Sequence, residues 1–221
     1  EYTFVSAGAD APRKFEKKYA TDIARLVLEQ REQFPADAYL MNMITNHDLN
    51  SWEGTEFQRY GRLTSAMAVL SFTLPGMPLI YTGQEVGMNR ALQFFEKDTA
   101  PDFNSNPDMT SFYKMLTMLK HTRHELRAGA APGFEPIDAG NENVLLFRRT
   151  SPDSSASMVV CVNLGKTDAT VTLPPEVATS RNIIAANISA NDFCVGQDEV
   201  PAQGINVTLA PGGYIVVPIG V

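Results

Sequence analysis

The sequence has few cysteines and no long apolar run, and both absences exclude classes of protein. Only two of its 221 residues are cysteines. Cys161 and Cys194 share no CxxC spacing and lack the histidine partners that a zinc site needs. We therefore expect either two buried thiols or a single disulfide. No stretch of about 18 apolar residues occurs, which argues against a membrane-spanning helix.

Positive charge is also scarce. The chain has 18 lysines and arginines against 25 aspartates and glutamates, which gives a formal net charge of -7. Basic residues gather only in short pairs such as Lys17-Lys18 and Arg148-Arg149. Because nucleic-acid binding depends on clustered lysine and arginine, we expect no nucleic-acid partner.

Length and hydrophobic content are those of an ordinary folded protein. The hydrophobic fraction is 44% of 221 residues, enough for one large domain or two small ones, and we favour two. The chain begins at Glu1 and its first residues have neither the basic nor the apolar region of a secretory signal. We therefore expect it to be part of a longer protein.

Helical patterns occur in the first 126 residues. Residues 21–34 have apolar side chains at helical spacing, with Thr21 as an N-cap and Pro35 at the end. Residues 11–20 could form a separate helical turn before it. A further helix is predicted to begin at Thr110 and to extend through "SFYKMLTMLKHTRHEL".

Two short apolar runs flank another predicted helix. Residues 39–45 and 78–81 are nearly continuous in apolar side chains, which is typical of buried parallel strands. Between them, residues 55–58 fit a capping box and begin a helix that should end at Pro75-Gly76. Strand, helix and strand in this order predict a βαβ unit and a parallel sheet.

The pattern changes to short β-strands after about residue 144. Turn residues separate these segments, and strands at such spacing predict an antiparallel β-sandwich. We place the domain boundary at about 129–132, which gives an α/β domain at 1–128 and an all-β domain at 129–221. The predicted strands are "VLLFRR", "SMVVCVNL", "ATVTLP", "NIIAANI", "INVTLAP" and "GYIVVPIG".

Polar side chains follow both predicted parallel strands. Asn46, His47 and Asp48 come directly after the first strand, and Gln84 and Glu85 follow the second. In a parallel α/β barrel, functional residues lie in the loops just past the carboxyl ends of the strands. These five residues are therefore candidates for a site, although an isolated Asn-His-Asp is also typical of an Asx turn.

Two motifs together resemble a known family. "MITNHD" at 43–48, followed by "LPGMPLIYTGQEVG" at 74–87, is similar to the seventh and eighth strands of the (β/α)₈ barrel in the α-amylase superfamily of glycoside hydrolases. Met43 departs from the pattern, because the family usually has an aromatic residue there. The resemblance implies a fold of the C-terminal portion of a (β/α)₈ TIM barrel, residues 1–128, followed by the superfamily's C-terminal antiparallel β-sandwich, residues 129–221.

The resemblance also implies roles for the first motif. Asp48 would be the third catalytic carboxylate, which neither attacks nor protonates the substrate. It would hold sugar hydroxyls and stabilise the positive charge that develops on the ring in the transition state. His47 would donate hydrogen bonds to the sugar, and Asn46 would orient the pair. The implied substrate is an α-glucan oligosaccharide or polysaccharide.

Three further features allow more than one interpretation. Trp52 could stack on a sugar ring or cap the rim of the barrel. Glu85 could contact substrate, but we expect it rather to accept backbone hydrogen bonds and fix its loop. Residues 94–98, "FFEKD", are interpreted as ordinary loop packing.

Part of the catalytic machinery has no counterpart in the sequence. Retaining hydrolysis needs a nucleophilic carboxylate and a general acid about 5 Å apart. In the family these come from the fourth and fifth strands, and nothing before Tyr39 matches their motifs. We expect the missing N-terminal part of the barrel to be the partner of this chain. Without it, open strand edges would favour self-association of an inactive piece.

Three functions remain open at this point. The first is part of an α-glucan hydrolase, the second a non-catalytic carbohydrate-binding or interaction module, and the third a glycosyl-transferring or isomerising member of the superfamily. An aspartate and a glutamate at the ends of the fourth and fifth strands, upstream in the longer protein, would favour an enzyme. No cofactor or metal site is expected in this chain, whereas calcium in the longer protein is left open. An extracytoplasmic bacterial location is favoured over the cytoplasm.

Overall fold

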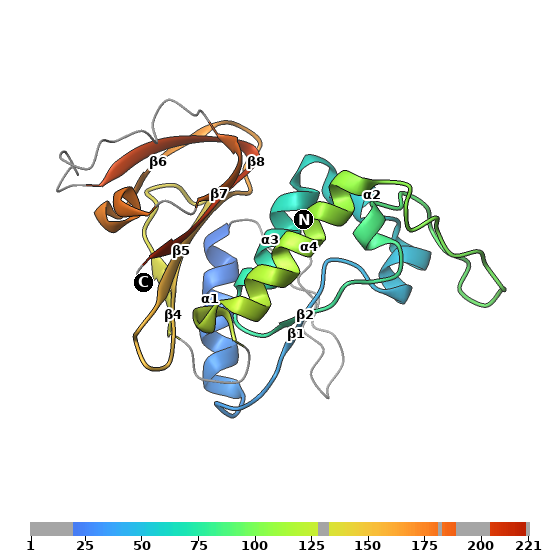
Figure 1. Ribbon diagram of the computed structural model, residues 1–221, viewed down its shortest axis with the longest axis horizontal. Coiled ribbons are helices and arrows are strands. Elements are labelled where there is room, and N and C mark those ends of the chain that lie inside the picture. The colour runs from blue at the N-terminus through green and yellow to red at the C-terminus, as the bar shows by residue number, and fades with distance from the viewer. Residues whose placement is uncertain (1–19, 128–132, 181–182, 189–203, 220–221) are drawn as a thin grey trace.

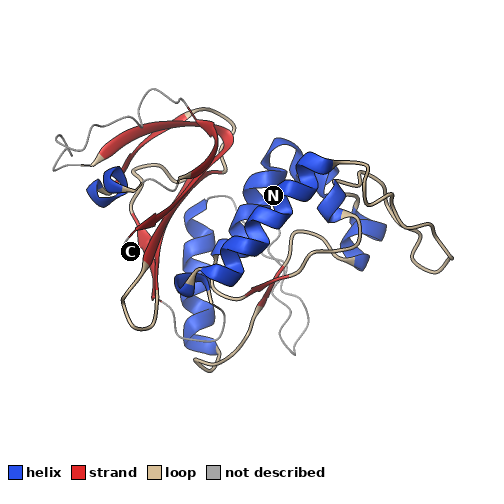
Figure 2. Ribbon diagram, viewed as in Figure 1, coloured by secondary structure: helices blue, strands red, loops and turns tan. Residues whose placement is uncertain are grey.

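The structure is a computed structural model that describes residues 20–127, 133–180, 183–188 and 204–219. A curled antiparallel sheet lies on one side, the longer helices pack against it, and a short parallel strand pair lies beyond them (Figures 1 and 2). Apart from Ala20, the predicted helical turn at 11–20 lies outside the described residues, as do Cys194 and the boundary at 129–132.

The first predicted helix is confirmed. Helix α1 spans Ala20–Gln33, so Thr21 lies inside the helix and the prediction of Thr21 as its N-cap was wrong. Its buried face includes Ile23, Leu26 and Val27, which belong to the main core. This face packs against the strand β4 (Val144–Thr150), so helix and sheet share apolar contacts.

The βαβ unit is present, with strands shorter than predicted. Strand β1 is Met41–Asn42 and strand β2 is Met77–Pro78, and they pair in parallel. Gly76 has a φ of 115°, and an added Cβ would lie 2.5 Å from the Leu40 carbonyl oxygen. A glycine is therefore needed where the two strands meet. The predictions of strands at 39–45 and 78–81 were too long, because each strand has a single described neighbour over two residues.

The helix predicted to begin at residues 55–58 is not one helix but three segments. They are α2 (Glu56–Tyr60), the 3₁₀ turn η2 (Gly61–Leu63) and α3 (Thr64–Thr73). The predicted capping box is confirmed, since the Thr55 hydroxyl accepts from the Gln58 amide and the Gln58 side chain accepts from the Thr55 amide. Gly61 has a φ of 54°, outside the helical region, and this breaks the helix.

Helix α4 spans Pro107–Thr122, so it begins three residues before the predicted start at Thr110. The Asn106 side chain accepts from the Met109 amide at 3.1 Å, and Pro107 occupies the first turn. An asparagine cap followed by proline is a favourable helix start, which explains the earlier beginning. The turns η3 (Gln84–Val86) and η4 (His124–Leu126) precede and follow this helix.

In residues 133–180, 183–188 and 204–219 the β-rich part is one curled antiparallel sheet, and the predicted β-sandwich is not shown by these residues. The strand order is β3-β4-β5-β8-β6, and β7 also pairs with β8. Strand β3 was not predicted, because its sequence contains a proline and little alternation. The remaining bounds are β3 (Gly133–Ile137), β5 (Ser157–Asn163), β6 (Ala169–Leu173), β7 (Ile184–Ile188) and β8 (Ile205–Ile219).

The long strand β8 explains why the described strands form one curled sheet. The two strands expected at 205–211 and 213–220 form one continuous strand that pairs with β6 at one end and β5 at the other. Gly212 lies in this strand with a φ of 76°, and an added Cβ would lie 2.4 Å from the Arg62 carbonyl oxygen. The sheet therefore curls within one strand at a glycine instead of dividing into two layers.

The central strands β4 and β5 are buried on both faces. Phe147 and Val160 join the core shared with the helices, whereas Leu146 and Cys161 face a second core inside the curl. Cys161 is a free, buried thiol, and burial raises its pKa to about 12. None of the described helices is long and apolar enough to cross a membrane.

A buried arginine also connects the sheet to the helices. Arg149 on β4 is fully buried, and its Nη1 donates to the Thr73 carbonyl oxygen at the end of α3 at 2.6 Å. Burial lowers the pKa of Arg149 to about 10, and the Glu125 carboxylate partly offsets this effect. The end of α3, from which the chain enters β2, is thereby fixed against the sheet.

Candidate functional site

The turn after β1 is organised by Asn46. Its side-chain Oδ1 accepts from the Leu49 amide at 2.8 Å, and its carbonyl oxygen accepts from the Asn50 amide at 2.9 Å. Its Nδ2 lies 3.3 Å from Sδ of Met43, the residue that replaces the family's usual aromatic side chain. Asn46 thus caps a helical turn that begins at His47, as the polar Asx-type pattern predicts.

His47 and Asp48 are the first residues of that turn. His47 Nε2 lies 3.6 Å from Asp48 Oδ2, and the two side chains are 62% and 60% exposed. The turn continues as the π-helical segment η1 (Leu49–Glu53). An imidazole and a carboxylate are therefore held side by side by a capped backbone while both remain accessible to a ligand.

Arg59 fixes this turn to the strand that precedes it. Its Nη2 donates to the Ile44 carbonyl oxygen at 2.6 Å, and its Nε donates to the Gly54 carbonyl oxygen at 3.1 Å. The guanidinium also lies over the Tyr60 ring, 4.9 Å from its centroid. The two ends of the segment that carries His47 and Asp48 are thus tied to one side chain. Sequence reasoning missed Arg59, because its partners are backbone carbonyls.

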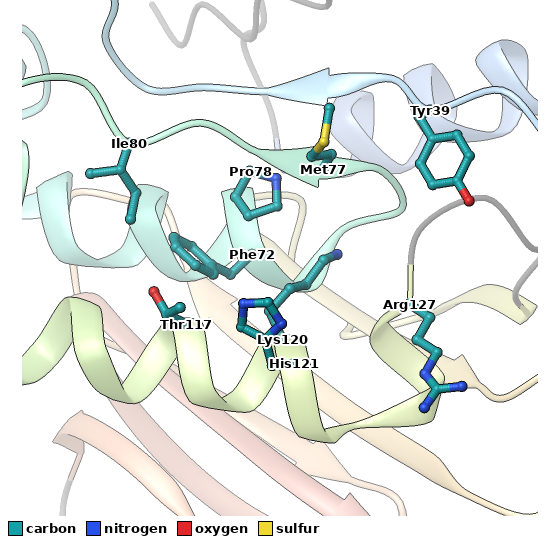
Figure 3. A pocket seen from close by; sticks show the side chains of 9 residues that line it. All are labelled: Tyr39, Phe72, Met77, Pro78, Ile80, Thr117, Lys120, His121 and Arg127. Atoms are coloured by element: carbon teal, nitrogen blue, oxygen red, sulfur yellow. The ribbon is translucent and has the colours of Figure 1, made fainter.

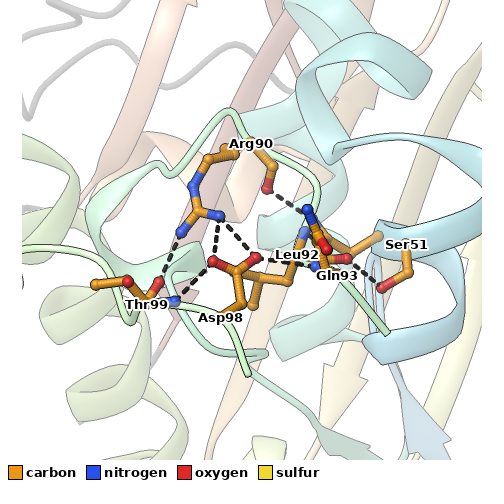
Figure 4. Close-up of polar contacts among 7 residues, drawn as sticks. Ser51, Arg90, Leu92, Gln93, Asp98 and Thr99 are labelled. Carbon is orange, nitrogen blue, oxygen red and sulfur yellow. Dashed lines mark hydrogen bonds and ion pairs between the residues drawn. The ribbon is translucent and has the colours of Figure 1, made fainter. Parts of the chain in front are cut away.

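The loop after η3 is tied to the other side of η1. The Asn50 side chain donates to the Arg90 carbonyl oxygen at 3.3 Å and accepts from the Leu92 amide at 2.7 Å. The Ser51 hydroxyl donates to the Leu92 carbonyl oxygen at 2.7 Å (Figure 4). Segments separated by about 40 residues are therefore neighbours at the candidate site.

Asp98 closes this loop on itself. Arg90 Nη1 contacts both of its carboxylate oxygens, at 2.9 and 2.8 Å, and the backbone amides of Gln93 and Thr99 donate to it at 2.9 and 2.6 Å (Figure 4). The amide of Gln93, then that of Thr99 and the Arg90 side chain, lower the pKa of Asp98. The carboxylate thus stays charged and holds residues 90–99 as a closed loop.

An exposed group of aromatic rings lies between the turn and this loop. Between ring centroids, Phe94 lies 5.6 Å from His47 and 5.4 Å from Trp52. The Phe95 centroid lies 4.8 Å from that of Phe94 and 6.3 Å from that of Trp52. We call Trp52, Phe94 and Phe95 the aromatic cluster. The interpretation of 94–98 as ordinary loop packing missed it, because no local pattern links residue 52 to residue 94.

Gln84, rather than Glu85, holds the turn after β2. Gln84 Oε1 accepts from the Tyr81 amide at 2.9 Å, and its Nε2 donates to the Tyr113 hydroxyl at 2.7 Å. Glu85 Oε2 is buried and has no hydrogen-bond partner among the described residues. Among the described residues, no hydrogen bond or ion pair joins Glu85 to Asp48 or His47. The expected loop-fixing role thus belongs to the neighbouring residue.

Glu56 is a buried carboxylate that sequence reasoning did not single out. It is 2% exposed, and neither carboxylate oxygen has a hydrogen-bond partner within the described ranges. Burial raises the pKa of Glu56 from 4.5 to about 8, Arg59 opposes this shift, and the charge of Glu85 adds to it. The sequence showed Glu56 only as the first residue after a helix cap, so its burial was not predictable from local pattern.

A pocket of about 490 Å³ lies along β2 and α4, and it contains none of the predicted site residues. Phe72, Met77, Ile80 and Thr117 form part of its wall, and Lys120 projects toward β2 (Figure 3). Lys120 Nζ donates to the Gly76 carbonyl oxygen at 2.7 Å, and burial lowers its pKa to about 7. The largely apolar wall follows the strand pair, whereas the polar groups of the candidate site lie on the turn after β1.

No group of three or more His, Cys, Asp or Glu side chains in the described part of the chain could hold a metal ion. The candidate site is made of the capped His47–Asp48 pair and the aromatic cluster beside it. Such a combination of accessible polar groups and aromatic rings suits a ligand with hydroxyl groups and apolar faces.

Comparison with known proteins identifies the family. A family profile described as "Alpha amylase, catalytic domain" matches residues 1–128. The chain therefore belongs to the α-amylase family, as the two motifs predicted. An alpha-amylase MalA of Haloarcula japonica is 33% identical over 145 residues, which is 64% of this chain and 20% of that protein.

Solved structures with a similar fold come from the same family. A maltogenic alpha-amylase AmyB from Thermotoga neapolitana has a TM-score of 0.67 at 15% identity, over 93% of this chain and 47% of that one. A debranching enzyme from Nostoc punctiforme has a TM-score of 0.65 at 19% identity, over 92% and 40%. The chain thus spans about a fifth of the curated relative and less than half of these structures.

Proposed function

We propose that this chain is the C-terminal part of a retaining glycoside hydrolase that acts on α-glucans such as starch and maltooligosaccharides. The observation that carries the proposal is the accessible His47–Asp48 pair on a capped turn that follows β1 after four residues, in a chain of the α-amylase family. The name of the relative from Haloarcula japonica, an alpha-amylase, supports the substrate class.

In this proposal Asp48 stabilises the transition state. A retaining glycosidase passes through a state in which positive charge develops on the sugar ring. The Asp48 carboxylate lies in an exposed position where it can accept hydrogen bonds from ring hydroxyls and attract that charge. The attraction is stronger in the transition state than in the ground state, so it accelerates the reaction instead of only tightening binding.

His47 and Asn46 have supporting roles. The His47 imidazole lies beside Asp48 and can hydrogen-bond the same sugar, whereas Asn46 holds the turn through its cap to Leu49. Asn46 is therefore proposed as a positioning residue. The nucleophile and general acid come, in this proposal, from the N-terminal part of the barrel.

The strand pair supports the proposal that further strands complete the barrel. β1 and β2 form a sheet of two strands, and the apolar side chains of Tyr39, Met77 and Ile80 beside it are exposed. Exposed apolar groups next to open strand edges are typical of surfaces that another part of a protein covers. We propose that barrel and β-rich domain divide at about residues 128–129.

Activity measurements on a protein that carries the complete barrel test the function. We expect it to cleave maltoheptaose and to release the new reducing end with the α configuration of the substrate bond, because retention requires two displacements. Products of inverted configuration would exclude the retaining mechanism. Absence of cleavage, together with saccharide binding, would favour the binding-module alternative.

The His47→Ala substitution tests the division of roles. A hydrogen bond to a sugar hydroxyl contributes about 1 to 2 kcal/mol, so we expect kcat/KM for maltoheptaose to fall on the order of 10-fold. His121→Ala, at an exposed position on α4, is the matched control and should leave kcat/KM unchanged. If kcat/KM falls more for His47→Ala than for Asp48→Asn, the roles proposed for the two residues are reversed.

A further inference from the structure

The aromatic cluster is exposed to an unusual degree for large apolar rings. Trp52 is 63% exposed and Phe95 is 82% exposed, while Phe94 lies between them and His47. Three adjacent rings on the surface form an apolar patch, and such patches on folded proteins generally mark a binding surface. Trp52 and the two phenylalanines come from different segments, η1 and the loop after η3, so the patch exists only in the folded chain.

Polar contacts of residues next to the rings in the chain keep the patch in place. Ser51, next to Trp52, donates to the Leu92 carbonyl oxygen, and the Gln93 amide, next to Phe94, donates to Asp98 (Figure 4). The Arg90–Asp98 ion pair closes the loop around the phenylalanines. A patch whose backbone is fixed in this way loses little conformational freedom when a ligand binds.

The position of the patch indicates its ligand. Phe94 contacts His47, which in turn lies beside Asp48, so the rings continue outward from the pair to which the proposed function assigns the reacting sugar. A pyranose ring presents C–H groups on its faces and hydroxyls around its edge. Its faces can pack on aromatic rings while its hydroxyls stay in water or bind polar side chains.

We propose that Phe94 and Phe95, together with Trp52, form a subsite that binds the sugar rings of an α-glucan next to the ring held at Asp48. This inference rests on the proposed function for its substrate class. Phe95 contacts Phe94 and Trp52 and is the most exposed of the three, so it binds the ring farther from Asp48. The subsite thereby favours oligosaccharides over short substrates.

Calorimetric binding of a thio-linked maltoheptaose, which is not hydrolysed, tests the subsite in the protein with the complete barrel. Phe94→Ala and Phe95→Ala should each weaken binding by about 3- to 10-fold, because each removes an aromatic contact. Phe95→Tyr keeps the ring and should bind as the unsubstituted protein does. Phe103→Ala, at a half-exposed phenylalanine outside the cluster, is the matched control and should have no effect.

The design separates this inference from the proposed function. If Phe95→Ala binds the thio-saccharide as tightly as Phe103→Ala does, the subsite is wrong, even where Asp48→Asn abolishes turnover. If Asp48→Asn leaves turnover unchanged while Phe95→Ala still weakens binding, the role of Asp48 is wrong and the subsite stands. If Phe95→Ala instead abolishes self-association in sedimentation without weakening saccharide binding, the patch is a protein interface and the inference is overturned.

Discussion

Replacing Asp48 with asparagine is expected to lower the turnover of maltoheptaose by about 10³-fold in the protein with the complete barrel. The substitution is nearly isosteric and removes only the negative charge. The Asp48 side chain is 60% exposed, and the cap that holds its turn comes from Asn46, so the fold should not change. The loss should appear in kcat more than in KM, because the lost interaction acts on the charge of the transition state.

Single-turnover and steady-state kinetics with maltoheptaose measure this loss, and thermal unfolding checks that the fold is kept. Asp37→Asn is the matched control, because Asp37 is exposed in a turn before β1. It should leave both turnover and melting temperature unchanged. Turnover of the Asp48→Asn protein within a few-fold of normal would contradict the assignment of the catalytic carboxylate.

Replacing Glu56 with glutamine is expected to change the pH dependence of stability. The folded protein holds a proton on Glu56 up to about pH 8, whereas the unfolded chain releases it near pH 4.5. The folded state therefore binds more protons between these values, and the free energy of unfolding decreases as the pH rises through this range. Below pH 4.5 both states are protonated, and the stabilisation from this group is fully present.

Glutamine keeps the shape of the protonated side chain and cannot ionise. The Glu56→Gln chain should therefore be about as stable as the unsubstituted chain at pH 4.5 and more stable at pH 8. The expected difference at pH 8 is a few kcal/mol, since each unit of pKa shift corresponds to about 1.4 kcal/mol. Burial is the main cause of the raised pKa, and the neighbouring Glu85 charge adds to it.

Urea unfolding of the 221-residue chain at several pH values measures this difference. Glu32→Gln, at an exposed position on α1, is the control for the general effect of removing one negative charge. It should change stability by less than about 0.5 kcal/mol at any of these pH values. Equal stability of the Glu56→Gln and unsubstituted chains at pH 8 would show that Glu56 is ionised or paired in the folded state.

The local elements were predictable from the sequence because short-range contacts form them. Helix α1 follows from apolar spacing, and the capping box at Thr55 is a contact between residues three apart. The Asn46 cap has the same short range. The family, too, followed from sequence, since its two motifs lie within residues 43–87 and the profile match agrees.

The tertiary structure decided the features that depend on contacts between distant segments. Residues 205–219 form one strand, not two, because β5 and β6 pair with its two ends and Gly212 allows close contact with the backbone of Arg62. Glu56 is buried only because surrounding segments cover it. The position of an ionisable group relative to water, and hence its pKa, is a property of the whole fold.

One part of the candidate site was predictable from the sequence, and the other part depends on the tertiary structure. The sequence by itself determined that Asn46, His47 and Asp48 follow a strand, because these residues are adjacent and a cap requires only a local turn. Only the tertiary structure brought Phe94 and Phe95 to His47 and Trp52, through side-chain and backbone hydrogen bonds between η1 and a loop about 40 residues later. No periodicity or local motif encodes such a contact, since it depends on where two separate segments meet in space.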